Sequence, residues 1–69
     1  MEKLSVSVII PTYNRAHLLK TTIPKYVQRY VVEIIIIDDY STDNTMNVVY
    51  ELIKEIPIIR YFRSEKKIF

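Results

Sequence analysis

The chain has 69 residues, 49% of them hydrophobic and 26% charged, a balance typical of one small folded domain over residues 1–69 and not of a disordered chain. Its formal net charge of +2 does not indicate a nucleic-acid-binding protein, and no stretch approaches the roughly 18 apolar residues that would span a membrane. Because cysteine and glycine are both absent, disulfides, cysteine-ligated metals and glycine-rich phosphate loops are excluded, and a cytoplasmic location is expected by default.

Apolar runs predict the strands. Residues 5–10 (SVSVII) are mostly β-branched or small, and residues 34–37 are four consecutive isoleucines. Continuous apolar runs of this kind are typical of strands covered on both faces, as in parallel sheets. Residues 58–62 (IIRYF) predict a third strand.

Helical spacing separates these strands. Apolar and aromatic side chains recur every three or four residues at Leu19, Ile23, Tyr26, Val27 and Tyr30. Asn14 is expected to cap the start of this helix, and Pro24 predicts either a kink or two short helices with Pro24 starting the second. The inner face of a second helix is marked by Val49, Leu52, Ile53 and Ile56. Pro57 is expected to end that helix.

The order of these elements predicts an α/β fold: a three-layer β-α-β-α-β unit with a parallel sheet of order 3-2-1. We call residues 11–15 (PTYNR) the first corner and residues 38–45 (DDYSTDNT) the second corner. Each corner follows a strand, so both would lie at the carboxyl ends of adjacent parallel strands. In open α/β sheets this edge is where ligands bind.

The two corners carry side chains suited to a nucleotide. Asp38 and Asp39 could accept hydrogen bonds from ribose hydroxyls or from a base N–H, or could instead favour the start of the next helix. Arg15 is a candidate donor that would offset repulsion between the two carboxylates. Tyr13 could stack on a base beside Pro11, or could simply cover the top of the core.

A calcium loop and a histidine catalyst are both disfavoured. The first, third and fifth positions of an EF-hand pattern would be Asp39, Ser41 and Asp43. However, Asn44 stands where the pattern needs glycine and Tyr50 where it needs a bidentate glutamate. We expect Asp43 to cap the following helix, and His17 to be a first-turn helix residue.

The segments VSVIIPTYNR and EIIIIDDYSTDNT resemble the opening of family 2 glycosyltransferases, the inverting enzymes of the GT-A (Rossmann-like) fold that transfer a sugar from a nucleotide diphosphate sugar. The resemblance implies that residues 1–69 are a truncated nucleotide-sugar-binding domain, the N-terminal half of a GT-A domain, with a UDP-sugar as favoured partner. It implies that Pro11 and Tyr13 line the base and ribose pocket and that Asp39 hydrogen-bonds the base. Arg15 and Asp38 would lie beside them in the nucleotide-binding set.

The chain departs from the family pattern at two points. Tyr40 stands where the family usually has glycine, so its ring is expected to narrow the pocket or strain the turn. The sequence also lacks the D-x-D segment that holds the metal and diphosphate in relatives, and it lacks their carboxylate base. We therefore expect no catalytic or metal-binding residue and no transfer by this chain alone; Mg²⁺ or Mn²⁺ is implied only for the complete enzyme.

Other interpretations remain open. The chain could be a non-catalytic oligomerising remnant without a ligand. In a 3-2-1 sheet the first strand, Ser5 to Ile10, is an edge, which predicts a homodimer through antiparallel pairing of two such strands. Nucleic-acid binding through the basic end is set aside in favour of a solvated basic surface, formed by Arg60, Arg63, Lys66 and Lys67.

Overall fold

The structure is a computed structural model that describes residues 4–66. In chain order its elements are β1 (Val6–Thr12), α1 (Ala16–Thr22), the 3₁₀ helix η1 (Ile23–Tyr26), β2 (Val31–Asp38), α2 (Thr45–Glu55) and β3 (Ile59–Arg63). The strands are parallel and lie in the order β1-β2-β3. The predicted α/β class and sheet order are therefore confirmed.

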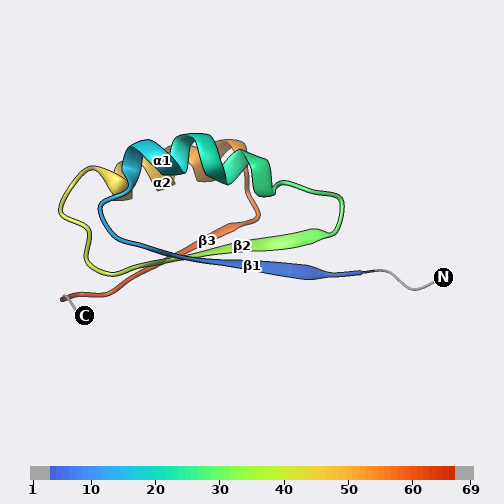
Figure 1. The fold of residues 1–69 in the computed structure, drawn as a ribbon, viewed down its shortest axis with the longest axis horizontal. Helices are drawn as coiled ribbons and strands as arrows, with labels where there is room; N and C mark the ends of the chain where they lie inside the picture. The colour runs from blue at the N-terminus through green and yellow to red at the C-terminus, as the bar shows by residue number, and fades with distance from the viewer. Residues whose placement is uncertain (1–3, 67–69) are drawn as a thin grey trace.

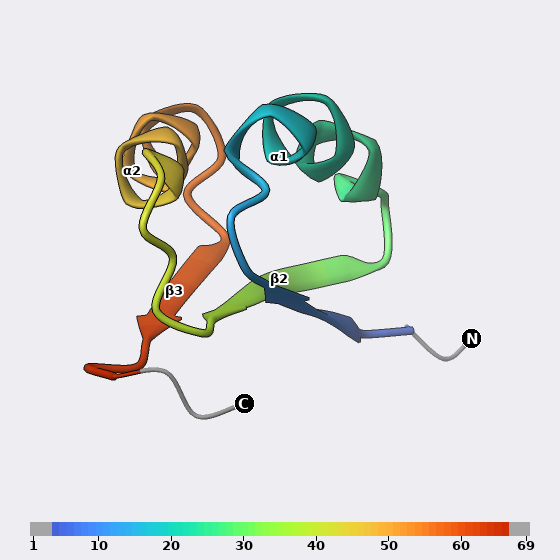
Figure 2. The same ribbon diagram turned by 60° about the vertical axis from the view of Figure 1, so that its left-hand side comes forward.

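Both helices lie on the same face of the sheet, side by side (Figures 1 and 2). Two crossovers of the same hand that step in the same direction across a sheet place their helices on one face. Within residues 4–66 the expected third layer is therefore missing. The other face carries Ile9, Ile37 and Phe62, which are 63%, 47% and 56% exposed.

The isoleucine run consequently divides between the two faces. Ile34 and Ile36 are fully buried under the helices, whereas Ile37 faces the side without helices. The prediction that these strands are covered on both faces is wrong for the described residues. The core is formed by Ala16, Leu19, Ile23, Ile34, Ile36, Val48, Val49, Leu52 and Ile59.

Pro24 has the predicted effect on the first helix. The α-helix α1 ends at Thr22 and the chain continues as η1, with Pro24 in its first turn. Proline lacks an N–H and its ring blocks the preceding turn, so a regular helix does not pass through it. Val27 is already extended, with φ −75° and ψ 96°, and is exposed, as is Tyr30, so the predicted continuation of the helix to Tyr30 is wrong.

The remaining elements differ from the sequence prediction only in detail. β1 continues through Pro11 to Thr12, which is tolerated because β1 is an edge strand. Helix α2 buries Val49 and Leu52 as expected, and also Val48, which the predicted face omitted. Among residues 4–66, no helix has the length and apolar character needed to cross a membrane.

Candidate functional site

The two corners lie side by side, as predicted. β1 and β2 are parallel, and Thr12 and Asp38 are register partners at their carboxyl ends. One residue further on, the backbone N–H of Asp39 donates a hydrogen bond to the carbonyl of Thr12 at 2.9 Å. The parallel pairing of β1 and β2 therefore places the first corner in contact with the second.

Asn14 links the corners through its side chain. Its Oδ1 accepts hydrogen bonds from the backbone N–H groups of Thr42, at 2.7 Å, and Asp43, at 3.2 Å. Its backbone has φ 49°, a left-handed conformation that asparagine tolerates better than most residues. The prediction that Asn14 caps the first helix is wrong, because Arg15 occupies the N-cap position and makes no side-chain capping bond.

Asp43 serves the starts of both helices. Its Oδ1 accepts hydrogen bonds from the N–H of Thr45, at 2.9 Å, and from the Thr45 hydroxyl. Its Oδ2 accepts the N–H of Ala16 at 3.4 Å, which satisfies one free amide of α1. The hydrogen bond from the Thr45 hydroxyl is the main cause that lowers the pKa of Asp43 from its ordinary value. Asp43 is not the N-cap residue of α2, which is Asn44, but its carboxylate accepts the first amide of α2 and an amide of the neighbouring helix α1.

A hollow of about 340 Å³ opens at this edge of the sheet. Its lining is Pro11, Thr12, Tyr13, Arg15, Ile37 and Asp39. Pro11 and Ile37 are register partners and supply an apolar floor on the face without helices. Four predicted nucleotide-binding residues thus come together around one cavity.

Thr12 is a lining residue that the sequence prediction missed. It is 7% exposed, and its hydroxyl has no hydrogen-bond partner among residues 4–66. Most buried hydroxyl groups are paired, so this group stands out. The only sequence signal was its position between Pro11 and Tyr13.

Asp38, the fifth predicted nucleotide-binding residue, does not line the hollow. It is fully buried on the helix side of the sheet, on the same face as Ile36. Its Oδ1 accepts hydrogen bonds from the N–H of Ser41, at 2.9 Å, and the Ser41 hydroxyl, at 2.5 Å. Its Oδ2 accepts the hydroxyl of Tyr61. Oδ1 therefore anchors the turn that follows β2, and Oδ2 links the end of β2 to β3.

Tyr61 shares the environment of Asp38. Burial, followed by the hydrogen bond and negative charge of Asp38, raises the pKa of the Tyr61 phenol above its ordinary value. The phenol therefore remains protonated and remains a hydrogen-bond donor to Asp38. Its ring also packs edge-on against Tyr50 of α2, with centroids 5.8 Å apart.

Arg63, at the end of β3, reaches the second corner. Its Nη2 donates a hydrogen bond to the carbonyl of Ser41 at 3.0 Å, and its Nε lies 4.0 Å from Oδ2 of Asp38. The guanidinium also lies over the ring of Tyr40, 4.5 Å from the centroid. The prediction of a solvated basic end is therefore wrong for Arg63, and Arg60 pairs with Glu33 at 3.0 Å. Lys67 lies outside the described residues.

Tyr40 occupies a strained backbone conformation. Its φ is 58°, in the left-handed region where a glycine has no steric penalty. Of the two expected effects of this ring, strain in the turn is present. The ring does not line the hollow, because it packs beneath Arg63.

The described residues do not fit a divalent metal by themselves. Within residues 4–66, no three aspartate, glutamate, histidine or cysteine side chains gather into a possible ligand group. The oxygens of Asp38 and Asp43 already accept hydrogen bonds from the surrounding chain. Asp39 alone offers fewer ligands than the six or so oxygens a hard cation requires.

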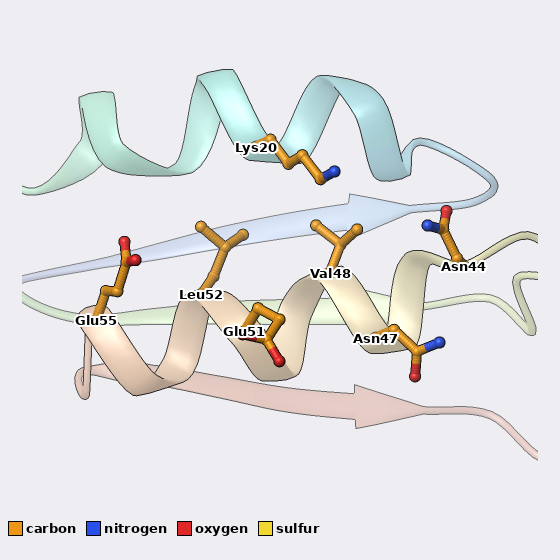
Figure 3. A pocket seen from close by; sticks show the side chains of 7 residues that line it. All are labelled: Lys20, Asn44, Asn47, Val48, Glu51, Leu52 and Glu55. Carbon is orange, nitrogen blue, oxygen red and sulfur yellow. The ribbon is translucent and has the colours of Figure 1, made fainter.

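A second, larger groove of about 410 Å³ lies between the two helices, away from the sheet. It is lined by Lys20, Asn44, Asn47, Val48, Glu51, Leu52 and Glu55. Val48 and Leu52 point toward α1 (Figure 3), yet they are 5% and 8% exposed, so the groove offers little apolar surface to a ligand. The corner hollow has the more suitable combination of an aromatic ring, a cation and an acid.

The fold is a parallel α/β sheet with a hollow at the carboxyl ends of β1 and β2. Open α/β domains of this class bind their ligands at this edge of the sheet. Residues 7–67 match the family model described as Glycosyl transferase family 2. The chain belongs to this family.

Two known proteins show the extent of the similarity. The GalNAc(5)-diNAcBac-PP-undecaprenol beta-1,3-glucosyltransferase of Campylobacter jejuni is 43% identical in a match covering 87% of this chain and 20% of that protein. The mannosyltransferase PcManGT from Pyrobaculum calidifontis, solved in complex with GDP-Man and Mn²⁺, is 27% identical and has a TM-score of 0.82, over 97% of this chain and 21% of that chain. The predicted match to the N-terminal part of a GT-A fold is confirmed. The chain spans about one fifth of the length of these relatives.

Proposed function

We propose that this chain is the nucleotide-binding segment of a glycosyltransferase and that it holds the base and ribose of a nucleotide diphosphate sugar in the corner hollow. The observation that carries the proposal is the convergence of Pro11, Tyr13, Arg15 and Asp39 on one cavity of about 340 Å³. A volume of this size is within the range of small-molecule sites.

Each lining side chain has a part in the proposed binding. The ring of Tyr13 stacks on the base, an interaction worth about 1–3 kcal/mol where it has been measured by alanine substitution. Asp39 accepts a hydrogen bond from a base N–H. Arg15 supplies positive charge beside the site, and Pro11 forms its rigid floor.

We propose a uridine nucleotide as the preferred ligand. A pyrimidine offers one ring to the 340 Å³ hollow and one ring N–H to the Asp39 carboxylate. PcManGT was solved with GDP-Man, so guanosine diphosphate is the comparison that decides the preference.

In a longer protein containing this segment, we propose inverting transfer of a sugar to an acceptor hydroxyl with loss of the nucleoside diphosphate. Residues 4–66 hold no group of side chains that could ligate a metal, so we assign them no step that runs through a metal. Their part is to bind and orient the donor, which places its reacting carbon for attack.

Calorimetric titration of the chain with uridine and guanosine diphosphates tests the proposal. We expect saturable binding with uridine diphosphate preferred. Asp39→Ala should remove the base preference while the circular dichroism spectrum stays unchanged. Glu51→Ala is the matched control, because it removes an exposed carboxylate from α2, outside the hollow. If neither nucleotide binds the unmodified chain, the proposal is wrong and a remnant without a ligand explains the chain better.

We also propose that two copies associate through β1. This strand pairs only with β2 among the described strands, and Val6 and Ile9 are 44% and 63% exposed. An open, apolar edge strand is a template for pairing with another chain. Antiparallel pairing of two β1 strands would make one continuous sheet from two copies.

A further inference from the structure

We infer that Tyr40 and Arg63 are positioning residues for the proposed nucleotide site: their stacked pair fixes the turn after β2 so that Asp39 faces the hollow. Neither residue lines the hollow. The inference rests on the proposed function, because it explains how the base-contacting acid is held.

Asp39 lies between two anchored points of the backbone. On one side its own N–H donates to the carbonyl of Thr12 at 2.9 Å. On the other side Ser41 is tied to Asp38 through its N–H and hydroxyl, at 2.9 and 2.5 Å. Tyr40 is the only residue between Asp39 and Ser41, so its backbone angles determine how the two anchors are joined.

Tyr40 needs outside support to keep those angles. A left-handed conformation costs a non-glycine residue about 1–2 kcal/mol, and it persists only where the surroundings hold it. The support comes from Arg63, whose guanidinium lies 4.5 Å from the centroid of the Tyr40 ring and whose Nη2 donates to the Ser41 carbonyl at 3.0 Å. One side chain therefore holds both Tyr40 and the residue after it.

Arg63 is itself fixed in place. Its side chain is 29% exposed, and its Nε lies 4.0 Å from the buried Oδ2 of Asp38. Asp38 and Arg63 are also register partners on β2 and β3. Because the strand pairing places this guanidinium at the turn, the support does not depend on a flexible surface side chain.

Substitution of Tyr40 by glycine separates positioning from stability. Glycine adopts the left-handed conformation without strain, so Tyr40→Gly relieves the strain in the turn while it removes the contact with Arg63. The melting temperature should therefore stay unchanged or rise. The same change removes the ring that Arg63 holds and lets the turn move. A positioning role therefore predicts weaker nucleotide binding by a variant that is no less stable.

The test measures the dissociation constant for uridine diphosphate and the melting temperature of four variants in one buffer. Tyr40→Gly and Arg63→Met should each raise the dissociation constant about tenfold. Tyr40→Phe keeps the ring and should bind like the unmodified chain. Arg60→Met removes a neighbouring β3 arginine that pairs with Glu33 on the other side of the sheet, and should also leave binding unchanged.

A double-mutant cycle asks whether Tyr40 acts through Asp39. If it does, adding Tyr40→Gly to Asp39→Ala should weaken binding no further, because the group that Tyr40 positions is already gone. Additive losses of affinity would contradict the inference. So would unchanged binding by Tyr40→Gly, or a loss that disappears after correction for the folded fraction.

The outcomes also separate this inference from the proposed function. If the unmodified chain binds no nucleotide, the proposed function fails and the inference fails with it. If the unmodified chain binds and Tyr40→Gly and Arg63→Met bind equally well, only the inference is wrong. If Arg63→Met does not fold, Tyr40→Gly decides the question.

Discussion

The side-chain oxygen Oδ1 of Asn14 accepts a hydrogen bond from the backbone N–H of Thr42 at 2.7 Å, so a residue that follows β1 holds the loop that follows β2. The hydroxyl of Ser41 strengthens the same junction by accepting the N–H of Asn14 at 2.8 Å. The two corners are therefore one hydrogen-bonded unit. The hollow between them has walls that are tied together independently of any ligand.

Replacing Asn14 tests this junction. Asn14→Ala should lower the free energy of unfolding by about 1–3 kcal/mol, because it leaves the N–H groups of Thr42 and Asp43 without their acceptor and places alanine at a left-handed φ. Asn14→Gly keeps the backbone conformation and should show the hydrogen-bond loss alone. Urea unfolding measures both; equal stability of all three proteins would contradict the role of the junction.

Asp43 predicts an acid dependence of stability. Its pKa is lower in the folded chain than its ordinary value of 3.8, so its contribution is fully present above that pH and is lost as the pH falls through the folded-state pKa. The neutral variant Asp43→Asn should therefore be less stable than the unmodified chain at neutral pH, and the difference should shrink below pH 3.8. A difference that stays constant on acidification would contradict this assignment.

Thr12→Val should stabilise the fold. The Thr12 hydroxyl is buried without a partner among residues 4–66, and replacing an unsatisfied buried hydroxyl by a methyl group of similar size removes a desolvation penalty of about 1–3 kcal/mol. Thermal unfolding followed by circular dichroism should show a higher melting temperature. A lower melting temperature would mean that the hydroxyl has a partner in solution.

The edge-pairing proposal predicts an association that depends on β1. The molar mass from light scattering should rise toward twice that of the monomer as concentration increases. Val8→Pro should abolish this rise, because proline removes a ladder donor and adds a ring at the edge. Glu65→Pro, placed after β3, is the control and should associate normally. A concentration-independent monomer would contradict the proposal.

The fold and much of the site were predictable because their signals are local. β-branched runs marked the strands, and the residues that follow them marked the corners. The isoleucine run did not reveal which face of the sheet each residue occupies. Because no polar residue interrupts Ile34 to Ile37, the sequence did not show that Asp38 lies on the buried side and Asp39 on the open side. An alternating strand would have distinguished them.

The supporting contacts were not predictable, because they join residues far apart in the sequence. Asn14 has the residue type of a helix cap, and only the parallel pairing of β1 and β2 brings it to Thr42 instead. Arg63 resembled a member of a basic tail. Its contact with Tyr40 follows from the position of β3 beside β2, which no local pattern around either residue specifies.

The most direct measurement of the central claim is a titration of ¹⁵N-labelled chain with uridine diphosphate, followed by amide chemical shifts. We predict saturable shifts concentrated at the residues of the corner hollow, including Thr12, Tyr13 and Asp39. Shifts centred instead on the groove between the helices, at Lys20, Glu51 and Glu55, would place the ligand elsewhere. Either that result or the absence of saturable shifts would contradict a nucleotide site at the two corners.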